Sequence, residues 1–389
     1  ANFDKGILLE KEAHFERAKA TYEDILQHAT DETIREKVRW RMEDMDDLIA
    51  EKAIYHRIDE NGKRVLTDIG MNIAENQTLM DILMEADAID FDNETAIFIP
   101  LKRDYIDRCL EQVPHEMPGD PGKNTFGTGA TPPFLKRATD DELRAASRDE
   151  YERIAQMVGE QQDVVGIFSL PVANDKSISL FEVAQLMEQH FPGLKMIATN
   201  RMADDEVTFL KGKDHWVDGT SLITSLAPMN TMVGPFLRSA RTGNNLLLLD
   251  LTIAGMSGGG SPESLLTQIH AQVLFMMVMA QTVNPGVFCM HGGIPGVTEM
   301  GGDLSYSSPH QPLINGAMAR VNTWITGFPS AQSGGSTSLT DVTLQAVSES
   351  ELSRNSLRKY GVHIVRHAMG ALGSLNFFSL EKFLEDCER

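Results

Sequence analysis

Hydrophobic residues recur at helical spacing along residues 7–58, in a segment dense in Glu, Lys, Arg and Leu. This spacing predicts two or three helices. The Asn-Gly-Lys at 61–63 is a breaker signal, so we expect helical structure to end there. Residues 78–114 then predict a helix, short strands around 92–93 and another helix. The Pro- and Gly-rich loop at 114–124 predicts a boundary near residue 118, between a helical and small α+β region (1–118) and a second domain (119–389).

After that boundary, short apolar or β-branched runs alternate with amphipathic stretches. This alternation predicts βα units and a parallel sheet. Eight runs fit strands, at 124–129, 164–170, 194–200, 221–227, 246–252, 286–292, 328–334 and 373–378. Eight units in about 270 residues predict an α/β fold, a TIM (β/α)8 barrel. A doubly wound open sheet is the alternative, but no GxGxxG follows the first run.

Polar residues recur where the predicted strands end. Active sites of TIM barrels are built at the carboxyl ends of the strands, so these residues predict one shared polar cavity. They are Thr128, Ser169, Asn200, Asn230, Asp250, His291, Gln332 and Asn376. We expect Asn200, Asn230 and Gln332 to contact a substrate there.

The stretch "NLLLLDLTIAGMSGGGSPES" (245–264) carries the end of the fifth predicted strand into a Gly-rich turn. We expect Asp250 and Thr252 to orient a substrate, and Gly258 and Gly259 to let the backbone approach a cofactor. The Ser-Pro-Glu that follows predicts a helix start. A plain Gly-rich loop before a capped helix is the alternative, and the missing GK[ST] excludes a Walker loop.

The longest interruption, residues 290–312, follows the sixth predicted strand and is rich in Gly. Long loops in compact folds often bind ligands or act as lids. We therefore expect His291, Glu299 and Asp303 to be catalytic and Tyr306 to contact the substrate.

After the seventh predicted strand, Asp341, Gln345 and Glu349 are spaced so that they share one helix face. We expect them to bind substrate at the barrel mouth, and a solvated acidic face is the alternative. In "HIVRH", His363 and His367 have helical i, i+4 spacing, but the Glu of HExxH is missing and no third ligand is near. We therefore expect no metal site.

The formal net charge is −21 and the sequence pI is about 4.9. This balance argues against a nucleic-acid groove, which needs clustered Lys and Arg. The three cysteines are far apart and form no CxxC, which is typical of reduced, cytoplasmic proteins. No apolar run reaches the length of a membrane span. We expect neither a nucleic-acid nor a membrane partner.

Several phrases together resemble the trimethylamine methyltransferase family. They are "GMSGGGSPESLLTQIHAQVLFMMVMAQTVNPGVFCMHG", "SGGSTSLTD" with the Gln that follows, "LNFFSLEKFLED" and "ILMEADAIDFDNETAIFIPLKRDYIDRCLEQVP". The resemblance covers about residues 65–385, and the order and spacing of the phrases carry it.

The resemblance implies a TIM barrel that moves a methyl group from a methylated amine to the Co(I) of a corrinoid on a separate protein. The chain is similar to the branch without pyrrolysine, whose members demethylate betaines. In that branch an ordinary residue fills the pyrrolysine position, which aligns near Gly301 or Gly302. We expect these two glycines to contact the cofactor. The resemblance implies no cofactor that is bound tightly to this chain. It also implies that the protein forms homo-oligomers.

The chemistry agrees with a quaternary ammonium donor, because such a group already carries its charge and leaves as a neutral amine. The protein then has to position and desolvate the donor, and carboxylates or an aromatic face would hold the cation. Two alternatives use the same barrel: a metal-dependent lyase or hydrolase, and a non-catalytic binding protein.

Overall fold

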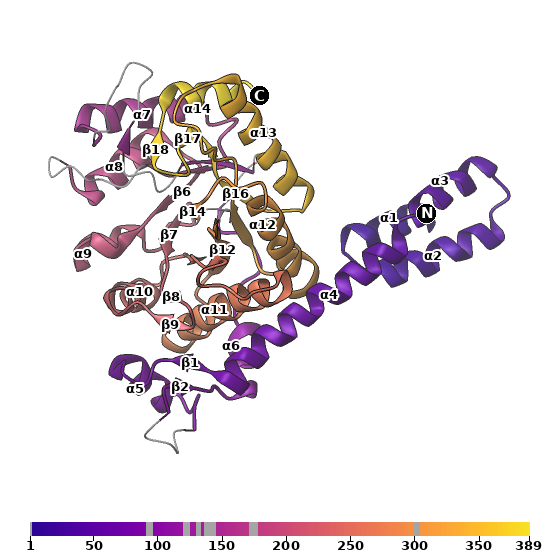
Figure 1. Ribbon diagram of the computed structural model, residues 1–389, viewed down its shortest axis with the longest axis horizontal. Helices are drawn as coiled ribbons and strands as arrows, with labels where there is room; N and C mark the ends of the chain where they lie inside the picture. Colours follow the sequence, from indigo (N-terminus) through magenta and orange to yellow (C-terminus); the bar gives the residue numbers. More distant parts are fainter. Residues whose placement is uncertain are drawn as a thin grey trace.

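The computed structural model describes residues 2–90, 96–119, 125–129, 134–135, 145–170, 178–298 and 304–389. Eight parallel strands close into a barrel in chain order, which confirms the predicted TIM fold (Figure 1). The strands are β3 (Phe126–Thr128), β5 (Ile167–Phe168), β6 (Leu194–Ile197), β7 (Trp216–Thr220), β10 (Leu246–Asp250), β12 (Cys289–Gly293), β15 (Ser330–Ser333) and β16 (Ile364–Met369).

Two of the eight predicted strands were wrong. The fourth barrel strand is β7 rather than 221–227, which contains the first strand of the hairpin β8 (Ile223–Thr224) and β9 (Ala227–Pro228). The eighth is β16 rather than 373–378, where β18 (Phe377–Phe378) pairs with β17 (Ala371–Leu372) and β4 (Phe134–Leu135). In both cases the true barrel strand carries a charged residue, and the uncharged run nearby forms a small sheet.

Helices surround the barrel in the order the alternating pattern predicts (Figure 1). They are α7 (Arg148–Glu160), α8 (Leu180–His190), α9 (Asp204–Val207), α10 (Asn230–Thr242), α11 (Pro262–Val283), α12 (Gln311–Arg320), α13 (Leu344–Lys359) and α14 (Leu380–Cys387). Helix α11 is capped by Ser261, as predicted. It is long and apolar enough to cross a bilayer, but 83% of its apolar window is buried inside the molecule.

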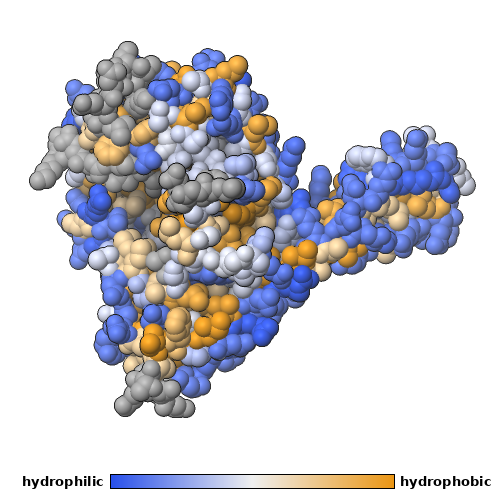
Figure 2. Space-filling view, viewed as in Figure 1, coloured by the Kyte–Doolittle hydropathy of each residue, from blue (hydrophilic) through white to orange (hydrophobic). Residues whose placement is uncertain are grey.

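The first four helices form an arm that projects from the barrel (Figure 1). They are α1 (Asn2–Lys11), α2 (Phe15–His28), α3 (Glu32–Met42) and α4 (Met45–Arg64). Their core includes Tyr22, Val38 and Met45, and Trp324, which follows α12 in the barrel, packs against it. Figure 2 shows that the surface of the arm is largely hydrophilic.

Helix α4 continues through Asn61-Gly62-Lys63, so the predicted break there was wrong. A Cβ on Gly62 would lie 3.0 Å from Cδ2 of His270 on α11. The glycine therefore serves the close approach of two helices, and its helix propensity is a minor cost.

A small module between the arm and the barrel holds α5 (Gln77–Glu85), α6 (Arg103–Glu111), and the pair β1 (Met71–Asn72) and β2 (Phe98–Ile99). Its apolar residues, among them Leu79 and Ile106, belong to the same buried cluster as Phe275 of α11 and Leu246 of β10. The module thus shares a core with the barrel, and the boundary near residue 118 stays a prediction.

Candidate functional site

Alternation along the barrel strands divides their side chains between the lumen and the surrounding helices. Leu247, Leu249, Met290, Ala331 and Ile364 belong to one buried cluster that lines the lumen. Residues at the intervening positions point outward, toward α10, α11 and α12. This parity decides which polar residues at the strand ends face a ligand.

Asp250 faces outward from the end of β10 and contacts α11. Its carboxylate accepts hydrogen bonds from the Thr252 backbone N–H at 2.8 Å and from Gln272 Nε2 at 2.5 Å. Gln272 Nε2 also donates to Thr252 Oγ1 at 2.8 Å, and all three residues are buried. Burial raises the pKa of Asp250 to about 7, although both hydrogen bonds favour the charged form. This placement makes Asp250 and Thr252 a joint between β10 and α11.

His291 also faces outward, into a buried polar chain that ends on the arm. Its Nε2 lies 3.2 Å from His270 Nδ1, and His270 Nε2 lies 2.9 Å from Asp59 Oδ1 on α4. Lys63 donates to the other oxygen of Asp59 at 2.9 Å. Burial opposes ionisation of Asp59, but its bonds to His270 and Lys63 hold its pKa well below the usual range. Burial and His270 hold the pKa of His291 well below its usual range.

Gln332 is the third predicted residue that turns outward. Its Nε2 donates to Ser330 Oγ at 2.9 Å, and a Cβ on Gly293 would lie 2.8 Å from its Oε1 and 3.4 Å from Asn315 Oδ1 on α12. It therefore lies between β12, β15 and α12.

Arg366 is the charged side chain that β16 turns toward the lumen. It follows the lumen residue Ile364 at a spacing of two, and it is only 1% exposed. Its Nη2 lies 3.4 Å from His367 Nε2, and His367 Nδ1 lies 2.8 Å from Ser333 Oγ. Burial lowers the pKa of Arg366 to about 9, so the guanidinium is cationic at neutral pH. The sequence prediction missed this group.

The backbone of β16 brings these side chains to one place. The register of its pairing with β3 shifts between Val365 and Met369, and His367 has φ of 57°. An irregularity of this kind re-aims side chains near a strand end and is frequent beside active sites. Parity counted along the sequence would find Arg366, but only after the strand itself is placed correctly.

The same part of the lumen contains mostly apolar side chains. Ile294, Ala371 and Leu375 are buried in the lumen cluster, and Tyr306 packs against it half-buried. Tyr306 follows β14 (Leu304–Ser305), which pairs with β13 (Gly296–Thr298). The predicted substrate contact of Tyr306 therefore lies beside the lumen.

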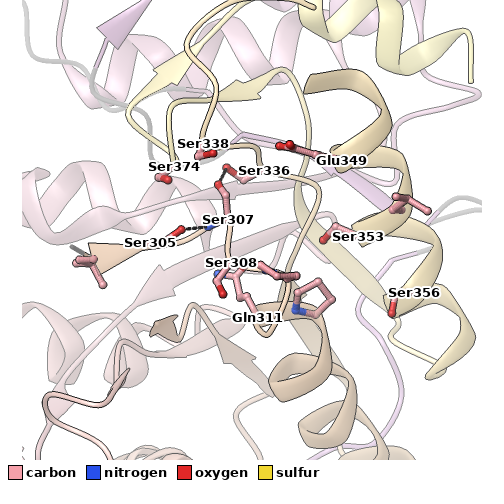
Figure 3. A pocket seen from close by; sticks show the side chains of 14 residues that line it. Ser305, Ser307, Ser308, Gln311, Ser336, Ser338, Glu349, Ser353, Ser356 and Ser374 are labelled. Carbon is pink, nitrogen blue, oxygen red and sulfur yellow. Dashed lines mark hydrogen bonds between the residues drawn. The ribbon is translucent and has the colours of Figure 1, made fainter. Parts of the chain in front are cut away.

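A serine-lined pocket of about 730 Å³ lies next to this segment (Figure 3). Figure 3 shows hydroxyls from the β14 segment, from the loop after β15 and from α13 around it. Ser307 and Ser336 are hydrogen-bonded across it at 3.0 Å. Glu349 lines it and accepts hydrogen bonds from Thr337 Oγ1 at 2.6 Å and from Gln345 Nε2 at 2.8 Å.

The remaining predicted residues are spread over the rim. Asp341 is exposed before α13, and Thr340 donates to it at 3.0 Å. Asn200 donates to the Met232 sulfur at 3.6 Å, and Asn230 at the start of α10 accepts from Asn76 at 2.9 Å. Both asparagines are exposed and away from the lumen cluster.

The glycines predicted to contact a cofactor also lie at separate places. A Cβ on Gly258 would collide with Leu265, so this glycine packs against α11, and Gly259 lines a separate pocket beside the α11 N-terminus. Glu299, Gly301, Gly302 and Asp303 lie outside the described residues.

His363 and His367 lie on or beside strand β16, so their predicted helical spacing was wrong. His363 Nδ1 accepts a hydrogen bond from the Ser330 backbone N–H at 3.2 Å, whereas His367 contacts Ser333. Within the ranges that the structure describes, no group of three or more His, Cys, Asp or Glu side chains is arranged to hold a metal ion.

Comparison with known proteins gives three further findings. A family model described as trimethylamine methyltransferase matches residues 16–389. The glycine betaine methyltransferase of Desulfitobacterium hafniense (strain Y51) is 26% identical over 361 residues, which are 85% of this chain and 74% of that protein. The crystal structure of the Methanosarcina barkeri monomethylamine methyltransferase superposes with a TM-score of 0.55 at 11% identity, over 86% of this chain and 71% of the other. A hydroxylamine complex of that enzyme gives 0.52, at 11% identity and over 87% and 79%. At this identity the structural likeness shows the fold alone.

Proposed function

Because this chain belongs to the trimethylamine methyltransferase family, we propose that it transfers a methyl group from a betaine-like or other methylated ammonium substrate to the Co(I) of a corrinoid on a partner protein. The family match over residues 16–389 carries this proposal, and it makes the chain a methyltransferase. The glycine betaine methyltransferase relative supports a quaternary ammonium as the donor.

The reaction is a displacement at a methyl carbon. The C–N bond breaks and its electron pair stays on nitrogen, so a quaternary ammonium becomes a neutral tertiary amine. The electron pair of the reduced cobalt forms the new bond to the methyl group. The corrinoid is thus the second substrate, and the chain has to hold the donor with its methyl group facing outward.

The barrel lumen near the end of β16 supports this role. Apolar side chains such as Ile294 and Leu375 exclude water from it, which strengthens electrostatic contacts to a bound donor. The ring of Tyr306 offers a face for a methylated ammonium. Glu349, with Gln345 bonded to it, places negative charge on the adjacent pocket. Glu299 and Asp303, from the segment at 290–312, remain our candidate catalytic residues.

We also propose a cytoplasmic location and a homo-oligomeric state. The three cysteines are unpaired in the structure, which agrees with a reducing compartment. The corrinoid protein would approach the rim formed by the strand ends, since the donor's methyl group has to reach cobalt there.

The test is incubation of the purified protein with chemically reduced cobalamin and a panel of donors. Glycine betaine, other betaines, trimethylamine and monomethylamine would each be offered, and methylcobalamin would be followed by its absorbance. Formation from at least one quaternary donor is expected. Stoichiometric zinc or manganese in the protein, with no methylcobalamin from any donor, would favour the metal-dependent lyase or hydrolase instead.

A further inference from the structure

Arg366 differs from every other buried cation that the structure describes. Lys382 and Arg354 lie within 2.6 Å and 3.4 Å of Asp386 Oδ1, and Lys195 donates to two backbone carbonyls and lies 3.4 Å from Glu188. For Arg366, neither Nε nor Nη1 has a hydrogen-bond acceptor, and no ion pair joins it to a described carboxylate. The chain has 56 acidic residues, so the absence of an ion pair at Arg366 does not follow from a lack of carboxylates in the sequence.

An unpaired buried guanidinium is costly, because desolvation of the charge is not offset by an opposite charge. Its position is also held by strained backbone, since His367 next to it has φ of 57°. Strain and an unmet charge at one point of the lumen indicate a group that an anionic ligand completes. Nε and Nη1 lie on different sides of the guanidinium, but each forms a planar fork with Nη2. Such a fork matches the two oxygens of a singly charged, planar carboxylate.

We propose that Arg366 binds the carboxylate of a zwitterionic methyl donor, and that His367 and Ser333 position the guanidinium for it. This assignment rests on the proposed function, which supplies the methylated end of the ligand. With its carboxylate on Arg366, the donor's ammonium group points toward the rim, where Tyr306 and the pocket with Glu349 lie. The structure thus assigns this chain to donors that carry an acid group, and simple methylamines lack the group that pairs with Arg366.

The first test compares two ligands on the native protein by titration calorimetry. Glycine betaine and choline share a trimethylammonium group, and a carboxylate in the first replaces a hydroxymethyl in the second. We expect glycine betaine to bind at least about 30-fold more tightly, since losing one partner of a buried charge pair costs 2 kcal/mol or more. Equal affinity, or tighter binding of choline or of phosphocholine, would overturn the assignment.

The second test uses Arg366→Met with Arg358→Met as the matched control. Arg358 is an exposed residue of α13, so its replacement changes net charge equally without touching the lumen. We expect Arg366→Met to lose the preference for glycine betaine over choline, with a melting temperature equal to or above that of the ligand-free native protein. Arg366→Lys should retain part of the preference, because it keeps the charge and loses the planar fork.

A melting temperature lowered in Arg366→Met, with the betaine preference intact, would show a structural role and refute the proposal. If the variant does not fold, the ligand pair on the native protein decides the question. Failure of the proposed function is distinguishable: glycine betaine would bind in preference to choline, yet no methylcobalamin would form. Methylcobalamin from choline and glycine betaine at equal rates would refute only the role of Arg366.

Discussion

The two faces of the barrel wall treat polar groups differently. On the outer face, Asp250 and His291 are bonded to α11, and through His270 the contacts reach α4 of the arm. On the inner face, Arg366 has two donor nitrogens without acceptors. The outer groups therefore fasten helices to the barrel, even though Nδ1 of His291 and Oε1 of Gln332 have no partner. The inner group differs in that it carries a charge that no described carboxylate pairs. Position at a strand end is not enough to indicate a binding residue, because the direction of the side chain decides.

The largest test of this contrast is Asp59→Ala, which removes the acid at the arm end of the outer chain. We expect a loss of about 3–5 kcal/mol in the free energy of unfolding, because the fully buried His270 loses its acidic partner and the half-buried Lys63 keeps only Glu60. Urea denaturation would measure it. Asp68→Ala, at an exposed pair with Arg64, is the control and should change stability by less than about 0.5 kcal/mol. Equal effects would show that the buried chain contributes nothing special.

The next test is Asp250→Ala, which should lower the free energy of unfolding by about 2 kcal/mol at pH 6 while the KM for the methyl donor stays unchanged. Gln272→Ala should cost a similar amount, and the double variant less than the sum, because the two residues share one hydrogen bond. The raised pKa of Asp250 means that its contribution declines as pH rises from about 4 to about 7. A raised KM with unchanged stability would instead place Asp250 among the substrate contacts.

A pH series sharpens the comparison further. The pKa values of His291, His363 and His367 are all lowered by burial, so the unfolded chain takes up protons near pH 6.5 before the folded one does. The histidine contribution to stability is therefore present above pH 6.5 and falls below it, by up to about 1.4 kcal/mol per pH unit for each histidine. Asp250 acts in the opposite direction below about pH 7. Asp59 adds nothing in this range, since its contribution is lost only below about pH 4.

Replacing His291 by Asn should reduce the slope between pH 7 and 5.5 by about one proton, measured by urea unfolding at each pH. An unchanged slope would mean that His291 is protonated in the folded protein, contrary to its lowered pKa.

The smallest expected effect is at the rim. Glu349 is partly exposed, so Glu349→Gln should raise the KM for a cationic donor only a few-fold, and 0.5 M salt should remove the difference. Initial rates at two salt concentrations would measure it. A larger, salt-independent rise would move the donor's ammonium group from the lumen into the serine-lined pocket.

The sequence predicted the barrel because six of its eight strands overlap the short runs that alternate with amphipathic stretches, and "LLLLD" of β10 is the most apolar of them. It failed at β7 and β16, whose polar residues are explained by tertiary contacts. Asp218 of β7 is hydrogen-bonded by Thr199 at 2.5 Å, and Arg366 of β16 faces a buried lumen. A local pattern carries no information on such partners, so neighbouring runs without a charged residue were predicted instead.

The site prediction was limited for a related reason. Asp250, His291 and Gln332 were correctly expected near strand ends, but the alternation of side chains turns each of them outward. Counting parity from the lumen leucines of β10 gives this result for Asp250. For Arg366 the same count from Ile364 works only once β16 is placed at Ile364–Met369, and the sequence prediction had put the eighth strand at 373–378.

Helix α4 has a geometric consequence for what the arm can do. Its first residue, Met45, packs in the core of the arm, and Ile58 packs against the barrel helices, so this rod sets the direction of the arm together with the contact between Phe15 and Trp324. Inserting a single residue between these points would swing the tip by about 100° and advance it by about 1.5 Å. A change in the length of α4 would thus reorient the surface of the arm relative to the barrel without altering the residues of the barrel.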